Sequence, residues 1–185
     1  MALTKTPVCD FGKKAEDFKL KSINNELISL NDIKGEKATL IMFICNHCPY
    51  VKAIIKDLIV DCKELKKEGI NSVAIMSNDT KKFPADSFEN MIKFAGENQF
   101  EDINYLIDES QEIAKNYAAV CTPDFFGYNK NSELQYRGRI RELKDLKPIK
   151  NGDSDLRIAM KMISESDKGP EKQIPSMGCS IKWFN

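Results

Sequence analysis

Two cysteines with two residues between them, Cys45 and Cys48, are the side chains of this sequence best suited to chemistry. Thiols at this spacing can close a small disulfide loop, and a thiolate exchanges with other disulfides by nucleophilic attack. The spacing alone is a weak signal in a chain with six cysteines. A pair of inert thiols and a metal site are the alternatives, and the choice depends on the elements that position the pair.

The residues on either side of the pair predict a strand followed by a helix. The apolar run 39–44 is typical of a central parallel strand that is covered on both faces. Pro49 suits the first turn of a helix, apolar residues recur at helical spacing from Val51 to Leu65, and Gly69 ends the pattern. A thiolate at a helix N-terminus is stabilised by the helix dipole and by unpaired N–H groups. This position therefore predicts a reactive dithiol.

The two sulfurs are expected to have different roles. Cys45, at the end of the strand, is predicted to be the more exposed sulfur and the nucleophile, and Cys48 to resolve the mixed disulfide. His47 precedes Cys48, where an imidazole can stabilise a nearby thiolate and make the pair more oxidising. We therefore predict a reduction potential of roughly −180 to −240 mV, above that of thioredoxin.

The rest of the chain predicts further elements around this unit. Asn24-Asn25 is a turn signal between short strands, which predicts a β-hairpin ahead of the core. The run 70–76 predicts a strand after the helix, and this order implies a right-handed crossover between parallel strands. Residues 77–79 should then lie on the same rim as the dithiol. Further helices are expected to start near Asp86, Asp108 and Asp153 or Ser154, and further strands in residues 105–107, 120–128 and 134–140.

The composition indicates one globular domain with balanced charge. Residues 1–185 are enough to bury a sizeable core and are expected to form a single domain. Basic and acidic residues number 28 each, so no overall charge favours nucleic acid or an anionic membrane. Residues 1–10 lack the apolar core of a secretory signal, and no run is long enough for a membrane span. We therefore expect a cytoplasmic protein, in which a CxxC pair is catalytic or metal-binding rather than structural.

Four segments together make the chain resemble a known family. They are AEDFKL, FICNHCPY, VCTPDFF and PSMGC, which begin at residues 15, 43, 120 and 175. With them the chain resembles the thioredoxin-like superfamily, in the peroxiredoxin-like branch related to alkyl hydroperoxide reductase and thiol-specific antioxidant. The resemblance implies an α/β thioredoxin-like fold, with a central mixed sheet flanked by helices and an N-terminal β-hairpin. The core is expected to cover about residues 15–163, and a C-terminal extension residues 164–185.

The same resemblance implies a substrate site beside the dithiol. It implies that the Thr122-Pro123 peptide bond is cis, faces the dithiol and offers backbone groups to an extended substrate. Together with Asn46 and His47, Thr122 and Pro123 are therefore expected to shape the site.

The chain also departs from the family patterns. A peroxide-reacting pattern Pro-x-x-x-Thr/Ser-x-x-Cys that ends at Cys48 has Ile41 and Cys45 at its proline and hydroxyl positions. The peroxidase site is therefore incomplete. Many thioredoxins carry a tryptophan and a buried acid where this chain has Ile44 and Thr39. No general base for the second thiol is evident from the sequence.

Three more cysteines bear on the site. Cys62 lies on the apolar face of the first long helix and is expected to belong to the core. Cys121 and Cys179 are candidate accessory thiols. Cys121 should lie near the site, where packing is its simpler role, and Cys179 could fold back as a distant resolving cysteine. Arg137 and Arg139 are expected to be solvated charges on a strand, with the steering of an anionic partner as the alternative.

The predicted function is that of a thiol-disulfide oxidoreductase that uses the dithiol to exchange with protein or small-molecule disulfides. Its electron donor would be a thiol system such as thioredoxin or glutathione. We expect no cofactor beyond the redox-active disulfide, no metal, and no nucleic acid or membrane partner. One alternative is a thiol-dependent hydroperoxide reductase. Another is a non-catalytic or metal-binding module, whose ligands would be the two thiols and His47, completed by Cys121 or Cys179.

Overall fold

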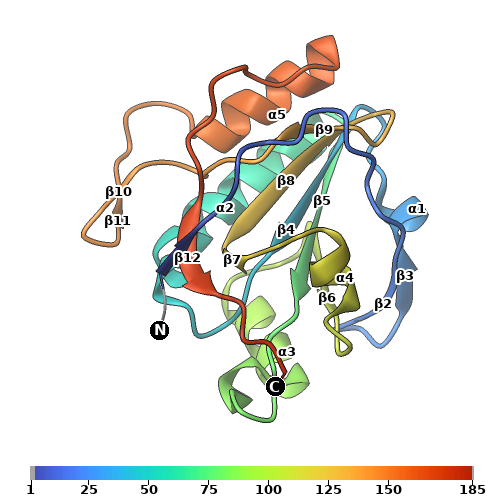
Figure 1. Cartoon of the computed structure of the whole chain (residues 1–185), viewed down its shortest axis with the longest axis vertical. Coiled ribbons are helices and arrows are strands. Elements are labelled where there is room, and N and C mark those ends of the chain that lie inside the picture. The colour runs from blue at the N-terminus through green and yellow to red at the C-terminus, as the bar shows by residue number, and fades with distance from the viewer. Residues whose placement is uncertain (1–2, 185) are drawn as a thin grey trace.

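A mixed seven-stranded sheet organises the computed structural model, which describes residues 3–184 (Figure 1). Its strands lie in the order β3-β2-β6-β5-β4-β8-β9. The strands of the protein are β1 Leu3–Lys5, β2 Lys19–Ser22, β3 Leu27–Ser29, β4 Ala38–Phe43, β5 Ile70–Met76, β6 Ile103–Ile107, β7 Cys121–Thr122, β8 Asp124–Asn129, β9 Leu134–Tyr136, β10 Leu143–Lys144, β11 Lys147–Pro148 and β12 Met177–Ser180. The helices are α1 Leu30–Ile33, α2 Pro49–Lys67, α3 Phe88–Glu97, α4 Glu112–Asn116 and α5 Asp155–Ser166, with a 3-10 helix η1 at Pro84–Asp86.

The unit that carries the dithiol has the predicted order of strand, helix and strand. β4 and β5 are parallel neighbours joined by α2, and β5 also pairs in parallel with β6. All six residues of β4 are buried, which explains why its sequence is apolar throughout instead of alternating. α2 begins at Pro49, in the first turn, where a missing N–H costs no hydrogen bond. The loops after β4 and β5 therefore leave the same edge of the sheet.

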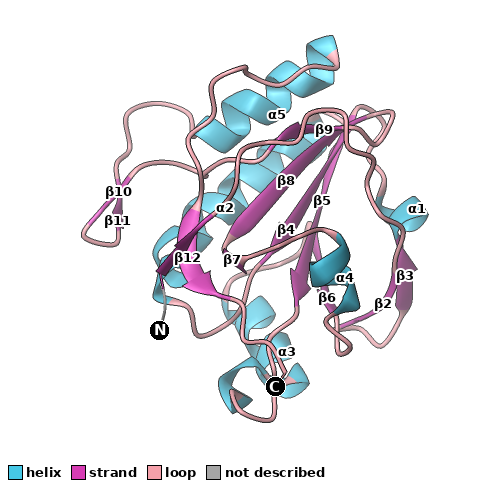
Figure 2. Ribbon diagram, in the orientation of Figure 1, coloured by secondary structure: helices cyan, strands magenta, loops and turns pink. Residues whose placement is uncertain are grey.

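Helices cover both faces of this sheet (Figure 2). α2, α3 and α5 pack on one face, and α1 and α4 pack on the other. β4 contributes to both layers, because successive side chains of a strand point to opposite faces. Its residues Leu40 and Met42 belong to the core under α2, whereas Ile41 and Phe43 belong to the core on the other side. The predicted central mixed sheet flanked by helices, with an N-terminal hairpin of β2 and β3, is confirmed.

A second, smaller sheet joins the two ends of the chain and was not predicted. Its strand order is β1-β12-β7. β1 lies in a region without clear periodicity, and it pairs with β12 of the C-terminal extension. β12 also pairs antiparallel with β7, which has only two residues. β10 and β11 form another short hairpin outside the predicted elements. Strands of two to four residues are too short to show the alternation by which strands are predicted.

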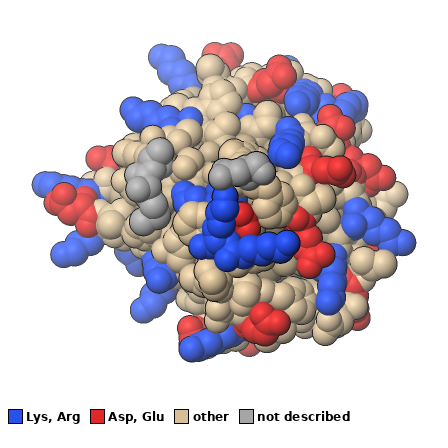
Figure 3. Space-filling model, turned by 60° about the horizontal axis from the view of Figure 1, so that its bottom comes forward, with Lys and Arg blue, Asp and Glu red and all other residues tan. Residues whose placement is uncertain are grey.

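The surface carries mixed charge. Figure 3 shows lysine and arginine interspersed with aspartate and glutamate on the face that lies at the bottom of Figure 1, in keeping with 28 residues of each sign. Among the helices within residues 3–184, none is both long and apolar enough to cross a membrane.

Arg137 is a buried cation, and the expectation that it is a solvated strand-face charge is wrong. Its side chain is 6% exposed, and that of its partner Asp124 is fully buried. Nη2 of Arg137 donates to Oδ2 of Asp124 at 2.9 Å, and Nε donates to Oδ1 at 3.3 Å. The guanidinium also lies over the ring of Phe126, 4.4 Å from its centroid. Arg139 is partly exposed and pairs with Asp155.

Removal of one member of the buried pair should be costly. Arg137→Met leaves the carboxyl group of Asp124 without its two guanidinium donors, and we expect the free energy of unfolding to fall by about 3–5 kcal/mol. The control Lys130→Met breaks an exposed ion pair with Asp167 and should cost about 1 kcal/mol or less. Urea unfolding of both variants measures the difference. Equal losses would contradict the importance of the buried pair.

Candidate active site

The loop from β4 to α2 holds both sulfurs of the dithiol. Cys45 is the second residue after β4, and Cys48 is the residue directly before α2. The carbonyl of Cys48 accepts a hydrogen bond from the backbone N–H of Lys52 at 3.0 Å, which closes the first turn. Cys48 is therefore the N-cap residue of a 19-residue helix. Unpaired N–H groups and the helix dipole favour a negative charge at this end.

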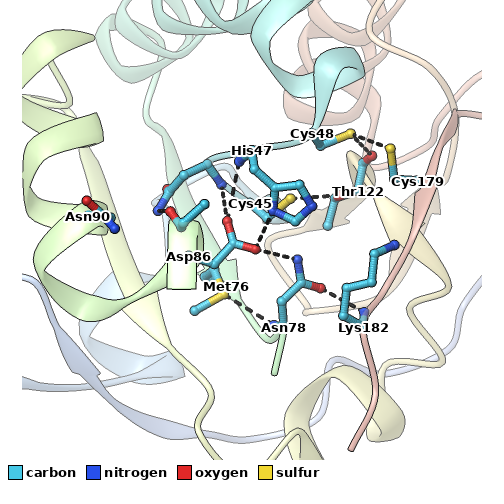
Figure 4. A network of polar contacts seen from close by, with 12 residues as sticks. Cys45, His47, Cys48, Met76, Asn78, Asp86, Asn90, Thr122, Cys179 and Lys182 are labelled. Atoms are coloured by element: carbon cyan, nitrogen blue, oxygen red, sulfur yellow. Dashed lines mark hydrogen bonds and ion pairs between the residues drawn. The ribbon is translucent and has the colours of Figure 1, made fainter. Parts of the chain in front are cut away.

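Both cysteines of the dithiol are buried, so the structure does not set Cys45 apart as an exposed sulfur. The relative exposure of Cys45 is 1% and that of Cys48 is 0%. Thr122 and Cys179, from β7 and β12, lie against the two sulfurs (Figure 4). A strand followed by a helix indicates that the dithiol lies at an edge of the sheet, but it gives no information on segments from elsewhere in the chain that fold over that edge.

Thr122 contacts both sulfurs from β7. Its hydroxyl oxygen lies 3.3 Å from Sγ of Cys45, and its carbonyl oxygen accepts a hydrogen bond from the thiol of Cys48 at 3.1 Å. The Thr122-Pro123 peptide bond is cis, as the family resemblance implies. Thr122 thus faces the dithiol, with Pro123 next along the chain.

Asp86 is a buried carboxylate that orders the dithiol loop, and sequence reasoning missed this role. Its Oδ1 accepts hydrogen bonds from the backbone N–H groups of Asn46 at 2.8 Å and His47 at 3.3 Å. Its Oδ2 accepts from Nδ2 of Asn78 at 2.8 Å and lies 2.7 Å from Nδ1 of His47 (Figure 4). Asp86 had been expected to cap the following helix, but Ser87 caps α3 instead. The predicted start of the helix is correct to within one residue, but the pattern gave no indication that the carboxylate of Asp86 binds the dithiol loop.

Hydrogen bonding keeps Asp86 ionised. Burial alone would raise the pKa of its carboxyl group, but hydrogen bonds from His47 and Asn78 outweigh burial, and the pKa is lowered. A negative charge is therefore present next to Cys45.

The surroundings of the two thiols shift their pKa values in opposite directions. The pKa of Cys45 is raised, because its thiol donates a hydrogen bond to Cys48 and because burial and the charge of Asp86 disfavour its thiolate. The pKa of Cys48 is lowered, because it accepts that hydrogen bond, although burial opposes the shift. The Thr122 carbonyl also opposes it, since it accepts a hydrogen bond from the thiol of Cys48. On balance the site favours the thiolate at Cys48, which is the reverse of the roles expected from the sequence.

Asn46 and His47, the predicted site-shaping residues of the loop, are held by their neighbours. Oδ1 of Asn46 accepts a hydrogen bond from the Tyr105 hydroxyl at 2.9 Å, and its Nδ2 donates to the Ala85 carbonyl at 3.1 Å. The ring of His47 stacks on Phe83 with centroids 5.7 Å apart and planes 7° from parallel. Asn46 is buried, whereas the side chain of His47 keeps 18% exposure. His47 is thus the member of this pair that a ligand in solution could touch.

Of the two candidate accessory thiols, Cys179 contacts the dithiol and Cys121 does not bond to it. Sγ of Cys179 lies 3.2 Å from Sγ of Cys48. Burial raises the pKa of Cys121, and its thiol donates to the carbonyl of Pro123 at 3.5 Å. Cys62 belongs to the core, as predicted. The structure contains all six cysteines as free thiols.

Three potential metal ligands also meet here. Ligand atoms of Cys45, His47 and Asp86 lie within 4.8 Å of one another. Both oxygens of Asp86 already serve as acceptors for the loop, for His47 and for Asn78. A metal ion would have to displace some of these donors, and a structural zinc usually takes four protein ligands. The cluster is therefore explained by its hydrogen bonds.

Comparison with known proteins confirms the predicted thioredoxin-like fold. Residues 11–142 match the AhpC/TSA family. None of the curated proteins matches the chain. An uncharacterized conserved protein from Geobacillus kaustophilus is 39% identical with a TM-score of 0.94, over 100% of this chain and 97% of that one. A hypothetical protein from Sinorhizobium meliloti 1021 is 34% identical with a TM-score of 0.89, over 98% of each chain. The thioredoxin domain of a thiol-disulfide oxidoreductase from Bacteroides vulgatus shares the fold alone, with 18% identity, a TM-score of 0.58, and coverage of 69% of this chain and 86% of that one.

Neutralisation of Asp86 should make the dithiol more oxidising. Asp86→Asn keeps an acceptor for the loop but removes the charge that opposes a thiolate, so the reduced form gains stability. We expect the reduction potential to rise by about 30 mV, a tenfold change in the equilibrium constant, from a starting value of roughly −180 to −240 mV. Redox titration against glutathione measures the shift. The control Asp102→Asn loses only an exposed ion pair with Lys66 and should leave the potential unchanged, and an unchanged or lower potential in Asp86→Asn would contradict the role of its charge.

Proposed function

We propose that this chain, which belongs to the AhpC/TSA family, is a thiol-disulfide oxidoreductase that exchanges a Cys45–Cys48 disulfide with disulfide substrates. One observation carries the proposal: two thiols on the loop at the N-terminus of α2 both contact Thr122, and their surroundings favour a thiolate on one of them. A thiolate with a second thiol in contact is the arrangement that disulfide exchange requires.

The exchange has two steps. The thiolate of Cys48 attacks a substrate disulfide, so that a mixed disulfide forms and one substrate sulfur leaves as a thiolate. Cys45 then attacks the sulfur of Cys48, which forms the Cys45–Cys48 bond and releases the second substrate sulfur. The proton of Cys45 goes to a departing thiolate. The substrate is reduced by two electrons, and a thiol donor returns the enzyme to its dithiol form.

His47 and Thr122 are positioned to support these steps. His47 lies between the two thiols on the same loop, and its side chain keeps 18% exposure, so it can meet an incoming substrate. The hydroxyl of Thr122 lies 3.3 Å from Cys45 and can donate to the sulfur when Cys45 becomes the attacking group. Asp86 holds the loop and is a positioning residue.

Loss of Cys48 should abolish turnover. We expect Cys48→Ser to reduce the rate of insulin disulfide reduction, with dithiothreitol as donor, to below about 1% of the wild-type rate. Cys9→Ser is the matched control, because Cys9 is partly exposed and lies outside the site, and it should keep its activity. Wild-type activity in Cys48→Ser would contradict the proposed function.

Trapping distinguishes the two orders of attack. Two double variants, Cys45→Ser with Cys179→Ser and Cys48→Ser with Cys179→Ser, each keep one sulfur of the dithiol. We expect a stable mixed disulfide with a cystine peptide to accumulate in the variant that keeps Cys48, as measured by intact mass. Accumulation only in the variant that keeps Cys45 would restore the order expected from the sequence.

A hydroperoxide reductase is the second candidate, and the family match favours it. In that reaction the thiolate of Cys48 would attack a peroxide oxygen and become a sulfenic acid, while the O–O bond breaks and the other oxygen leaves as water or an alcohol. Against this activity, Ile41 and Cys45 stand where the peroxide-reacting pattern has proline and a hydroxyl residue. Consumption of hydrogen peroxide with dithiothreitol as donor, faster than insulin reduction under the same conditions, would favour the second candidate.

A further inference from the structure

The C-terminal strand β12 covers the edge of β7 next to the dithiol. Cys179 pairs in register with Thr122 of β7, and the other edge of β12 pairs with β1. The Oγ of Ser176, just before β12, donates to the carbonyl of Pro123 at 2.9 Å. Backbone hydrogen bonds on both sides therefore determine the position of Cys179, which is not part of a free loop.

The segment after β12 is also tied to the site. The backbone N–H of Lys182 donates to Oδ1 of Asn78 at 2.9 Å, and Nδ2 of Asn78 donates to Asp86 (Figure 4). The same side chain thus connects the C-terminal segment to the carboxylate that orders the dithiol loop. The position of β12 is coupled to the geometry of the site.

This register brings a third sulfur to the dithiol. Sγ of Cys179 lies 3.2 Å from Sγ of Cys48, and a disulfide bond is about 2.05 Å long, so an approach of about 1 Å joins them. Cys45 lies three residues before Cys48 on the same loop, and Thr122 contacts the sulfurs of both. Cys48 is therefore the common neighbour of two thiols, one on the β4–α2 loop and one on β12.

We propose that Cys179 is a third redox residue that competes with Cys45 for the sulfur of Cys48, a step that rests on the proposed function. Starting from the Cys45–Cys48 disulfide formed in turnover, the thiolate of Cys179 attacks the sulfur of Cys48. The Cys48–Cys179 bond forms and the Cys45–Cys48 bond breaks, and Cys45 keeps the electron pair and takes the proton that Cys179 lost. The step is an isomerisation and needs no further oxidant or reductant.

The exchange determines whether the site is covered. In the Cys48–Cys179 form, β12 is covalently bound over Cys48, and Cys45 is a free thiol. In the fully reduced form, no covalent bond holds β12, so an incoming chain can displace it. Both cysteines of the dithiol are buried and Cys179 lies against Cys48, so movement of β12 would open a path for a polypeptide disulfide to Cys48.

Disulfide mapping tests the proposal. Protein oxidised with diamide and blocked with N-ethylmaleimide is digested, and its linked peptides are identified by mass spectrometry. We expect both Cys45–Cys48 and Cys48–Cys179 linkages in the wild type, and mainly Cys48–Cys179 in Cys45→Ser. Cys121→Ser added to Cys45→Ser is the matched control, because Cys121 lies one residue pair along the same ladder, opposite Ser180, and the linkage should persist.

The outcomes separate this inference from the proposed function. If Cys48 stays unlinked in Cys45→Ser while the wild type forms Cys45–Cys48 and reduces insulin, Cys179 is not a redox residue and the proposed function stands. If the wild type forms neither linkage and does not reduce insulin, the proposed function itself fails. Transfer of the linkage to Cys121 in Cys45→Ser would also overturn the role of Cys179.

Gly178 offers a second, independent test through the position of β12. A Cβ at Gly178 would lie 2.0 Å from the carbonyl oxygen of Thr122 and 2.6 Å from its carbonyl carbon, so Gly178→Ala cannot keep the present pairing with β7. Gly96→Ala is the control, because nothing lies within 4 Å of its Cβ. In the Cys45→Ser background we expect Gly178→Ala to lower the yield of Cys48–Cys179 about tenfold and Gly96→Ala to leave it unchanged.

The same variant should open the site. In reduced, folded protein, N-ethylmaleimide should modify Cys48 about tenfold faster in Gly178→Ala than in Gly96→Ala, because the cover is displaced. Circular dichroism and urea unfolding establish that both variants are folded. An unchanged yield of Cys48–Cys179 in folded Gly178→Ala would show that the linkage does not depend on β12 and would overturn the proposal.

Discussion

The site depends on one buried negative charge, the carboxylate of Asp86. A buried charge is tolerated only when hydrogen bonds replace the water that it has lost. Asp86 receives these bonds from the dithiol loop and from Asn78 after β5, and Asn78 is bonded in turn to Lys182 near the C-terminus. Segments far apart in the sequence are thus held together by the requirement to satisfy a single carboxylate. The geometry of the sulfurs follows from this arrangement.

Two thiols that are only three residues apart are chemically different, because a hydrogen bond between them, burial and, third, the charge of Asp86 all raise the pKa of Cys45, whereas the pKa of Cys48 is lowered. Cys48 lies at the N-terminus of α2, whose dipole favours a negative charge, whereas Cys45 lies next to Asp86, which opposes one. Burial strengthens both influences, because the protein interior screens charges less than water does. Which thiol has the lower pKa therefore depends on the residues around the loop, and it cannot be inferred from the loop sequence.

The proposed redox function requires the cover over the two buried sulfurs to open locally. β12 is bonded to β7 over two residue pairs and to β1 over three. Local opening of this short ladder breaks far fewer contacts than unfolding of the seven-stranded sheet does. The cover also carries its own thiol, Cys179. A bond between Cys179 and Cys48 would therefore couple the redox state of the dithiol to the position of β12. A site that is closed at rest protects a thiolate from unwanted oxidation.

The sequence by itself determined the dithiol unit and most of the main sheet. The apolar run of β4, the proline and helical period of α2, and the β-forming run of β5 are local patterns that do not depend on distant partners. The family resemblance added the cis bond at Thr122-Pro123. These features were predictable because each is written in consecutive residues.

Only the tertiary structure decided the charge, the cover and the third sulfur of the site. Asp86 had the sequence signature of a helix cap, and Arg137 that of an exposed strand residue, because neither pattern reveals a partner far along the chain. The sequence made Cys179 a candidate accessory thiol, but β1, β7 and β12 are too short to show periodicity, so the register that brings it to Cys48, 131 positions away, required the structure. Burial and electrostatics are properties of the assembled neighbourhood, and the neighbours of this dithiol come from five separate parts of the chain: residues 45–48, 76–86, 105, 122 and 179–182.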